Sequence, residues 1–326
     1  MCGIIGAASS RSVGKILIKG LQLMEYRGYD SAGVVLNKDE EILRLRSLGK
    51  VSKLEEKMIS KKPKAFSGIA HTRWATHGAP SEENAHPHGS HDDIYIVHNG
   101  IIENHEEIRG FLRNEGYEIT SETDSELIAH LVHFYKKDTQ DTLQALMKAT
   151  HELNGAYSIA VVCKQEKGKV YAARQKSPLL VGLGIEENFV ASDPLAIVNI
   201  TEKFHMLEDG DFAVVTNEDV VIYDKEGDPV ERDELKIDAT ATSTTKGEYK
   251  HFMEKEIYEQ PDCIGNTING RLGENDVLDN VFGLGSSDSF KDVKRIQFVA
   301  CGTSLHAAKT ARKWFEDICE IPCYID

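Results

Sequence analysis

The chain has 326 residues and a net charge of −15 when histidine is counted as neutral. Its 38 Lys and Arg are outnumbered by 53 Asp and Glu, which argues against binding to nucleic acids or anionic membrane surfaces. Hydrophobic residues make up 40% of the chain, so we expect packed cores, and the length suggests about two domains.

Short apolar runs alternate with polar loops in the first half of the chain. Apolar residues from Val13 to Met24 recur at helical spacing and predict a helix. Three runs are expected to be strands: 34–36, 68–72 and 94–97. The last is expected to end in a turn at Asn99-Gly100, since both residues tolerate positive φ. Further helices are expected over 103–114, from about 123, and from a cap at Asp141.

Strand-like runs dominate from 156 to 224. This order of elements predicts an α+β layered sandwich up to about residue 235. Residues 239–246 are small and polar and suggest a linker, followed by a helical stretch over 249–273. A strand at 295–300 leads into a helix, and a second strand begins near 322. We expect this second domain to be incomplete, because so little chain cannot cover both faces of a parallel sheet.

Several features indicate a cytoplasmic protein. No apolar run approaches the ~20 residues of a membrane span. The first residues lack the basic segment of a secretory signal. The six cysteines are scattered without paired spacing, which is typical of reduced thiols in the cytosol.

Cysteine at position 2 is the first candidate for catalysis. When the initiator Met is removed, Cys2 carries a thiol and a free α-amine on one residue. The amine, with a pKa of about 8, can act as the base for the thiol. Taken alone, Cys2 is better explained as a small buried side chain in a first strand.

Polar residues suited to a small zwitterion follow along the chain. Asn99 and the backbone N–H of Gly100 offer two donors for an oxyanion, although an ordinary turn explains them too. Arg73 can grip a carboxylate, and Trp74 can close over a small site. Asp124 can pair with a ligand ammonium or simply cap a helix.

Two further clusters leave alternatives open. Seven of the 13 His lie between residues 71 and 105. The segment at 105–109 lacks the second His of HExxH and no CxxC occurs, so we favour a solvated, hydrogen-bonding His loop over a metal site. Thr303 and Ser304, where a strand meets a helix, suit a phosphate, or Ser304 is an N-cap.

Together the motifs resemble one family. They follow in the order MCGIIG, YRGYDSAG, AHTRWATHG, NAHPH, VHNGIIENH, SETDSE, KEIYEQP and ACGTS. The chain resembles the N-terminal portion of the glutamine–fructose-6-phosphate aminotransferases (isomerizing). The resemblance implies an N-terminal-nucleophile hydrolase αββα sandwich, the glutaminase domain, over 2–240. It further implies a linker and helical connector over 241–292 and the start of an α/β sugar-isomerase (SIS) domain over 293–326.

The resemblance also implies residue roles. Cys2 matches the nucleophile, and Asn99 with Gly100 matches the oxyanion hole. The glutamine site is matched by Arg73 for the carboxylate, Asp124 for the ammonium, Thr76 and His77 in a covering loop, Trp74 as an ammonia-channel gate, and Arg27 and Gly28 in a loop beside the nucleophile. Thr303 and Ser304 match part of a sugar-phosphate cradle.

The implied reaction begins with hydrolysis of glutamine to glutamate and ammonia. In the full-length family enzyme, a homodimer, the ammonia converts fructose 6-phosphate to glucosamine 6-phosphate. We expect the chain to show only the glutaminase activity, without metal or cofactor.

Three alternatives stay open. Another N-terminal-Cys amidotransferase, such as an amidophosphoribosyltransferase or an asparagine synthetase, shares the nucleophile, but KEIYEQP and ACGTS argue against it. A non-catalytic sugar-phosphate sensor would lack Cys2, Arg73, Asn99 or Asp124, and all four are present. A metallohydrolase would use the His-rich loop.

Overall fold

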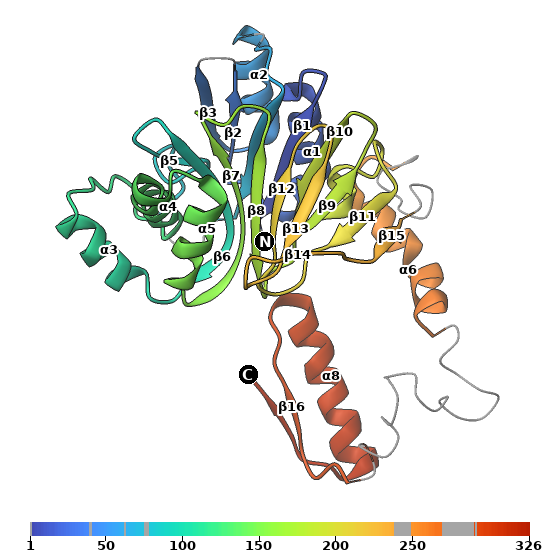
Figure 1. Cartoon of the computed structure of the whole chain (residues 1–326). Coiled ribbons are helices and arrows are strands. Elements are labelled where there is room, and N and C mark those ends of the chain that lie inside the picture. The colour runs from blue at the N-terminus through green and yellow to red at the C-terminus, as the bar shows by residue number, and fades with distance from the viewer. Residues whose placement is uncertain are drawn as a thin grey trace. The chain divides into compact units, whose positions relative to one another are not determined.

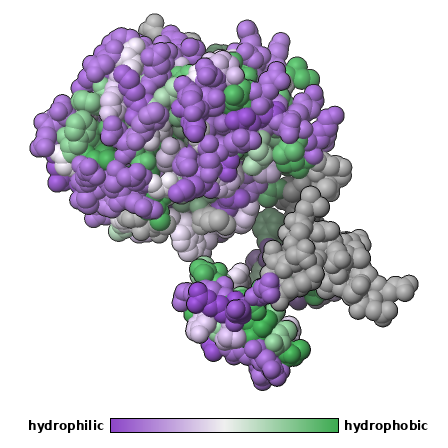
Figure 2. All heavy atoms as spheres, turned by 60° about the horizontal axis from the view of Figure 1, so that its bottom comes forward, coloured by the Kyte–Doolittle hydropathy of each residue, from purple (hydrophilic) through white to green (hydrophobic). Residues whose placement is uncertain are grey.

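The computed structural model describes residues 2–38, 41–61, 63–74, 78–237, 249–268, 290 and 292–326. The chain divides into two compact units, residues 1–244 and 245–326, which we describe separately. In the described residues, no helix has both the length and the apolar character needed to cross a membrane. The face of the first unit seen in Figure 2 is mostly hydrophilic, as expected for a chain with so many charged side chains.

Two antiparallel sheets form the first unit (Figure 1). The strands of sheet A are β1 (Gly3–Ser9), β2 (Ser31–Asn37), β3 (Ile42–Leu48), β4 (Ser67–Arg73), β9 (Leu180–Leu183), β10 (Glu187–Ala191), β11 (Lys203–Met206) and β15 (Glu234–Lys236). They lie in the order β15-β11-β9-β10-β1-β4-β2-β3. The central strand β1 therefore has β4 and β10 as its neighbours.

Sheet B consists of β5 (His88–Ser90), β6 (Ile94–Ile102), β7 (Gly155–Cys163), β8 (Val170–Gln175), β12 (Phe212–Val215), β13 (Val220–Tyr223) and β14 (Pro229–Val230). They lie in the order β14-β13-β12-β8-β7-β6-β5. The helices of this unit are α1 (Gly14–Leu23), α2 (Val51–Lys61), α3 (His105–Asn114), α4 (Ser125–Thr139) and α5 (Thr142–His151), with 3-10 turns η1 (Glu25–Arg27) and η2 (Pro194–Ala196).

Three separate buried cores define four layers. One core joins α1 and α2 to sheet A, with Leu17 and Leu54 fully buried in it. A second lies between the two sheets and includes Ile4, Ile69 and Val97. The third joins sheet B to α3, α4 and α5, which stand together beside β5 and β6 in Figure 1. The αββα sandwich expected from the sequence is confirmed.

The helices expected near 13–24, 103–114, 123 and 141 are all present. The side chain of Asp141 caps α5 by accepting a hydrogen bond from the Gln144 nitrogen at 2.7 Å. The sequence patterns did not predict β3 or α2. In β3, Leu43 and Leu45 pack against the core on the helix side of sheet A, and Ile42 packs against the core between the two sheets. The arginines that alternate with these leucines obscure the apolar pattern of this edge strand.

The prediction of a turn at Asn99-Gly100 is wrong. Strand β6 continues through both residues, and Asn99 pairs with Ser158 of β7. Gly100 has φ of +135°, and a Cβ atom there would lie 1.9 Å from the Ala156 carbonyl oxygen. The glycine is therefore required by the approach of the neighbouring strand rather than by a turn.

The second unit contains a parallel strand–helix–strand segment. Its elements are α6 (Phe252–Ile268), β16 (Ile296–Phe298), α8 (Gly302–Cys319) and β17 (Cys323–Ile325), and Ile296 pairs with Cys323. These match the expected helix and strands, whereas the expected linker at 239–246 lies outside the described residues. The N-cap expected at Ser304 is wrong, because Cys301 occupies the N-cap position of α8 and makes no side-chain capping bond.

Candidate active site

Polar side chains lie at one end of the core between the two sheets. Alternate residues of a strand share a face. On the inner face of sheet A, Cys2 therefore lies next to the core residue Ile4, and His71 and Arg73 lie on the same face as Ile69. On the inner face of sheet B, Asn99 lies on the same face as the core residue Val97. Two strands of sheet A and one of sheet B thus bring chemically active groups to one place.

These groups surround a cavity of about 260 Å³. Of the residues singled out in the sequence, seven line it: Cys2, Arg27, Arg73, Trp74, Asn99, Gly100 and Asp124. The remaining walls come from His86, His98, Ile101, Thr123, Ser125, Ser177 and Pro178. The cavity therefore combines a thiol, two guanidinium groups, a carboxylate and a carboxamide.

The Cys2 thiol contacts the backbone that follows β4. The Trp74 nitrogen donates to Cys2 Sγ at 3.3 Å, and Sγ lies 3.5 Å from the Trp74 carbonyl oxygen. Burial raises the pKa of the Cys2 thiol above its ordinary value, while the Trp74 amide acts in the opposite direction. The thiol therefore needs a base to become a nucleophile near neutral pH.

Asn99 connects the two sheets through its side chain. Its Nδ2 donates to the Cys2 carbonyl oxygen at 3.2 Å, and its Oδ1 lies 3.0 Å from His71 Nε2. The carboxamide of a sheet B residue is thus held between two residues at sheet A. Its donor end faces the cysteine.

Asp124 occupies the N-cap position of α4 but makes no side-chain capping bond. Instead its Oδ2 accepts from the Ile102 nitrogen at 2.9 Å, and its Oδ1 accepts from Ser125 Oγ at 3.2 Å. Only 5% of the residue is exposed. The carboxylate is therefore tied to the end of β6 and to the cavity wall, so the simple capping alternative is wrong.

Two arginines supply positive charge to the cavity. Arg73, almost fully buried, ends β4 and donates from Nη2 to the Gly78 carbonyl oxygen at 3.2 Å. Arg27 donates from Nε to Asp193 Oδ2 at 2.9 Å, and Tyr26 donates to the same oxygen at 2.7 Å. Positive charge is thereby fixed at two points in an acidic protein.

Gly28 does not line the cavity but allows its wall to form. A Cβ atom at this position would lie 2.7 Å from the Arg73 carbonyl carbon and oxygen and 2.8 Å from the Trp74 nitrogen. Thr72 Oγ1 also donates to the Gly28 carbonyl oxygen. The backbone at Gly28 therefore packs directly against the backbone segment that contacts Cys2.

Trp74 is half exposed and packs edge-on against Tyr29, with the ring centroids 5.9 Å apart. Thr76 and His77 of the expected covering loop lie outside the described residues. Thr303 and Ser304 belong to the second unit, where they are exposed in the first turn of α8. The structure thus groups the proposed glutaminase residues that it describes.

The prediction of a solvated loop for the histidine-rich segment is wrong, because His71, His86, His88 and His98 are buried. Burial lowers the pKa of His71 to about 3 and that of His88 to about 3, and it lowers the pKa of His86 as well. His88 Nε2 lies 3.1 Å from Thr123 Oγ1. Within the described ranges, no three His, Cys, Asp or Glu side chains are grouped so as to hold a metal ion.

The sequence did not assign site roles to His71 or Asp193. His71 could have been found from strand alternation, since it lies two residues before Arg73 and shares its face. Asp193 gives no such signal, because it is 166 residues from Arg27 in the chain.

A sequence profile described as a glutamine amidotransferase domain matches residues 71–199. This part of the chain is therefore similar to a glutamine amidotransferase domain. Over its full length it is 48% identical to the glutamine–fructose-6-phosphate aminotransferase (isomerizing) of Pseudomonas putida and 49% identical to that of Idiomarina loihiensis. It covers 54% of each relative and so spans about half their length. The resemblance noted in the sequence is confirmed.

Two solved structures share the fold. The glutamine phosphoribosylpyrophosphate amidotransferase from B. subtilis has a TM-score of 0.62 at 19% identity, covering 99% of this chain and 65% of that one. An allosteric regulatory enzyme of purine biosynthesis has a TM-score of 0.61 at 23% identity, covering 69% of this chain and 49% of that one. At these identities, both likenesses concern the fold alone.

Proposed function

We propose that this chain hydrolyses glutamine to glutamate and ammonia at the cavity around Cys2. The observation that carries the proposal is the match between the cavity and the three polar groups of glutamine. Arg73 is assigned to the carboxylate and Asp124 to the α-ammonium, which places the side-chain amide near the thiol. Arg27, Gly28 and Trp74 shape the surrounding wall, and Thr76 and His77 are proposed to cover the substrate.

In the proposed reaction, removal of Met1 leaves Cys2 with a free amine that accepts the thiol proton. The sulfur attacks the amide carbon, and the negative charge on the oxygen is stabilised by Asn99 Nδ2 and the Gly100 N–H. The C–N bond breaks as the nitrogen takes up the proton, and ammonia leaves. Water then attacks the thioester carbon, which releases glutamate and restores the thiol.

For the ammonia we propose fructose 6-phosphate as the acceptor. The support is the name of the relatives, which are aminotransferases of that sugar phosphate. Thr303 and Ser304, at the start of α8, are proposed to contact its phosphate. We propose domain boundaries at 2–240, 241–292 and 293–326, with the last segment beginning a SIS domain, and the parallel β16-α8-β17 segment supports this assignment.

We further propose a cytoplasmic protein that acts as a homodimer in its full-length form, without nucleic acid, membrane, metal or cofactor. All six cysteines are free thiols, which supports a reducing compartment. The excess of acidic residues supports the absence of nucleic-acid and anionic-membrane partners.

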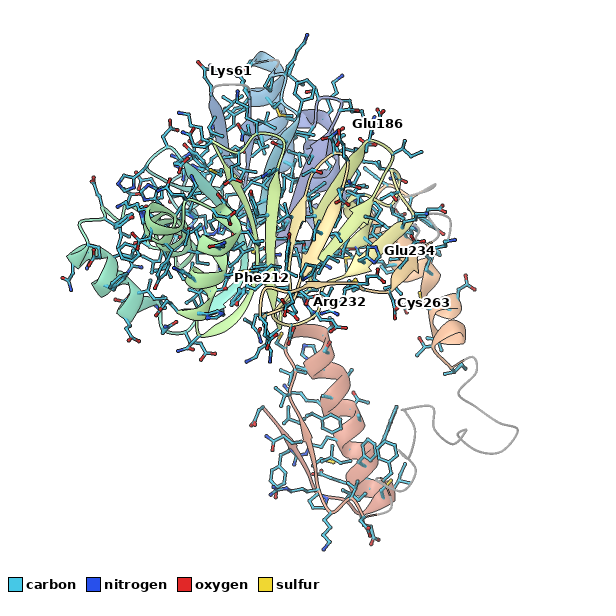
Figure 3. The ribbon with its side chains drawn as sticks, viewed as in Figure 1. Lys61, Glu186, Phe212, Arg232, Glu234 and Cys263 are labelled. Atoms are coloured by element: carbon cyan, nitrogen blue, oxygen red, sulfur yellow. The ribbon has the colours of Figure 1, made fainter. Side chains whose placement is uncertain are left out.

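The test is glutamate release by the purified chain after mass spectrometry confirms that Met1 is absent. Cys2→Ala is expected to abolish release. Cys263→Ala is the matched control, because Cys263 is exposed on α6 in the second unit (Figure 3). Equal rates in Cys2→Ala and wild type would refute the proposal. Loss of activity on adding a chelator would instead favour the metallohydrolase.

A further inference from the structure

His71 lies beneath the proposed oxyanion donor without lining the cavity itself. Its Nε2 is 3.1 Å from the His98 carbonyl oxygen and 3.0 Å from Asn99 Oδ1. One ring nitrogen therefore faces the backbone and the side chain of two consecutive residues of β6. This contact also crosses from sheet A to sheet B.

We propose that the neutral His71 imidazole, protonated on Nε2, is a positioning residue that holds the Asn99 carboxamide with its NH2 group toward Cys2. The proposal rests on the proposed function, in which that NH2 group stabilises the oxyanion. His71 does not touch the substrate in this account. It acts only through Asn99.

The protonation state of His71 Nε2 follows from its partners. A backbone carbonyl can only accept hydrogen bonds, so the contact with the His98 oxygen requires a proton on Nε2. The Asn99 atom that faces this N–H must then also be an acceptor, which identifies it as Oδ1. At the other end of the carboxamide, the Cys2 carbonyl oxygen requires a donor. Two independent acceptors therefore demand the same orientation of Asn99.

A flipped Asn99 would be unfavourable at both ends. Its NH2 group would face the His71 N–H, and its oxygen would face the Cys2 carbonyl oxygen. Because both contacts are buried or partly buried, water cannot easily compensate for two opposed pairs. The imidazole thus excludes the orientation that would present an oxygen lone pair to a developing oxyanion.

The surroundings keep the ring in this state and place. Burial disfavours the charged imidazolium, so both partners of Nε2 face a neutral ring. His86 stacks on it with a centroid separation of 4.0 Å and an interplanar angle of 13°. His86 Nδ1 in turn accepts from the His98 nitrogen at 3.2 Å. Within the described part of the chain, the buried His71 Nδ1 has no hydrogen-bond partner, consistent with an unprotonated nitrogen.

Three substitutions separate orientation from packing. In His71→Gln the side-chain amide nitrogen can replace Nε2 as a donor, whereas His71→Asn is too short and His71→Leu has no donor. We expect the Leu and Asn variants to lose about 10- to 100-fold in kcat for glutamine, up to the loss that follows removal of one oxyanion donor. KM is expected to change little, because His71 does not line the cavity. His71→Gln is expected to recover most of kcat.

Alkylation of Cys2 by iodoacetamide serves as the second readout. This displacement forms no oxyanion, so its rate is expected to be equal in wild type and all three variants. The proposal is overturned if His71→Leu keeps the wild-type kcat, if His71→Gln is as impaired as His71→Leu, or if alkylation falls in parallel with kcat.

A third measurement does not depend on activity. Nitrogen NMR of the wild-type imidazole is expected to find the His71 proton on Nε2, and a proton on Nδ1 would overturn the proposal. If the wild-type chain releases no glutamate although this tautomer is found, the proposed function fails and the placement of Asn99 by His71 stands.

Discussion

The main-chain nitrogen of Trp74 points at the sulfur of Cys2 from 3.3 Å. A single amide is a modest source of stabilisation for a thiolate, and burial outweighs it, so the pKa of the thiol is raised. The geometry thus supplies a positioned thiol but not a pre-ionised one. This fits a mechanism in which a separate base removes the proton.

The first prediction concerns this thiol. In protein that retains Met1, we expect alkylation of Cys2 by iodoacetamide to be slow at pH 7. We expect its rate to keep rising with pH beyond pH 9, the ordinary pKa of a cysteine. Peptide mass spectrometry separates Cys2 from the exposed Cys263, Cys301 and Cys319. A plateau below pH 7 would show that the thiol is activated without a neighbouring base.

The second prediction concerns Asp193, which holds Arg27 with Oδ2 and accepts from the Leu195 nitrogen with Oδ1 at 2.9 Å. Asp193→Asn keeps the Leu195 contact but loses the charge that orients Arg27. We expect it to raise KM for glutamine several-fold with little loss of stability. Asp193→Ala loses both contacts, and we expect it also to lower the free energy of unfolding by about 2 kcal/mol.

Asp141→Ala is the matched control for Asp193→Ala, because Asp141 caps α5 and does not line the cavity. We expect a loss of about 1 kcal/mol in stability with KM unchanged. Urea unfolding and steady-state kinetics on the same samples check both effects. A normal KM in Asp193→Asn would show that Arg27 does not need its charged partner.

The third prediction compares two glycines. Gly100→Ala places a methyl group against the Ala156 carbonyl oxygen at a positive φ, so we expect lost activity and a destabilisation above about 1 kcal/mol. Gly110 lies exposed in α3 with nothing within 4 Å of an added Cβ. Gly110→Ala is expected to stabilise the protein by about 0.5–1 kcal/mol with unchanged kcat. Thermal unfolding distinguishes the pair, and two equal shifts would contradict this account of β6.

The fourth prediction concerns acid stability. Burial is the main cause that lowers the pKa of His88 from 6.5 to about 3. Between these pH values the unfolded chain binds more protons than the folded one, so stability falls as pH falls from 6.5 toward 3. Each such imidazole contributes a slope of at most about 1.4 kcal/mol per pH unit.

His88→Gln removes this titration while keeping a polar partner for Thr123. We therefore expect a shallower dependence of unfolding free energy on pH than in wild type over that window. Urea unfolding at several pH values provides the comparison. Parallel curves for the two proteins would mean that His88 is not buried in its neutral form.

Half of the residues that line the cavity were singled out in the sequence, because each carries a group that can bind or attack glutamine. Arg73, Asp124 and Cys2 are examples, although only the resemblance to a family favoured a functional role for Asp124 and Cys2 over a structural one. The patterns failed where the cause is tertiary. The local sequence Asn99-Gly100 predicts a turn, yet the glycine is required there because the carbonyl oxygen of a neighbouring strand lies too close for a side chain. Asp193 meets Arg27 only after the chain has folded.

Secondary structure follows the same division. The apolar stripe of α1 is visible in the sequence because one whole face is buried. Strand β3 lies at the edge of its sheet, and its alternating arginines resemble a loop. Ser304 has the residue type of a helix cap, but the backbone enters α8 three residues earlier, at Cys301. Local preference cannot decide such boundaries without the neighbouring contacts.

Cys2 and Arg73 are carried by one sheet, whereas Asn99 is carried by the other. A slide of one sheet across its partner by a single residue, about 3.3 Å, would exceed the length of the hydrogen bonds that join them here. The proposed glutaminase activity therefore depends on the alignment of the two sheets. On heating, we expect glutamate release to fail at a lower temperature than the one at which the strands themselves separate.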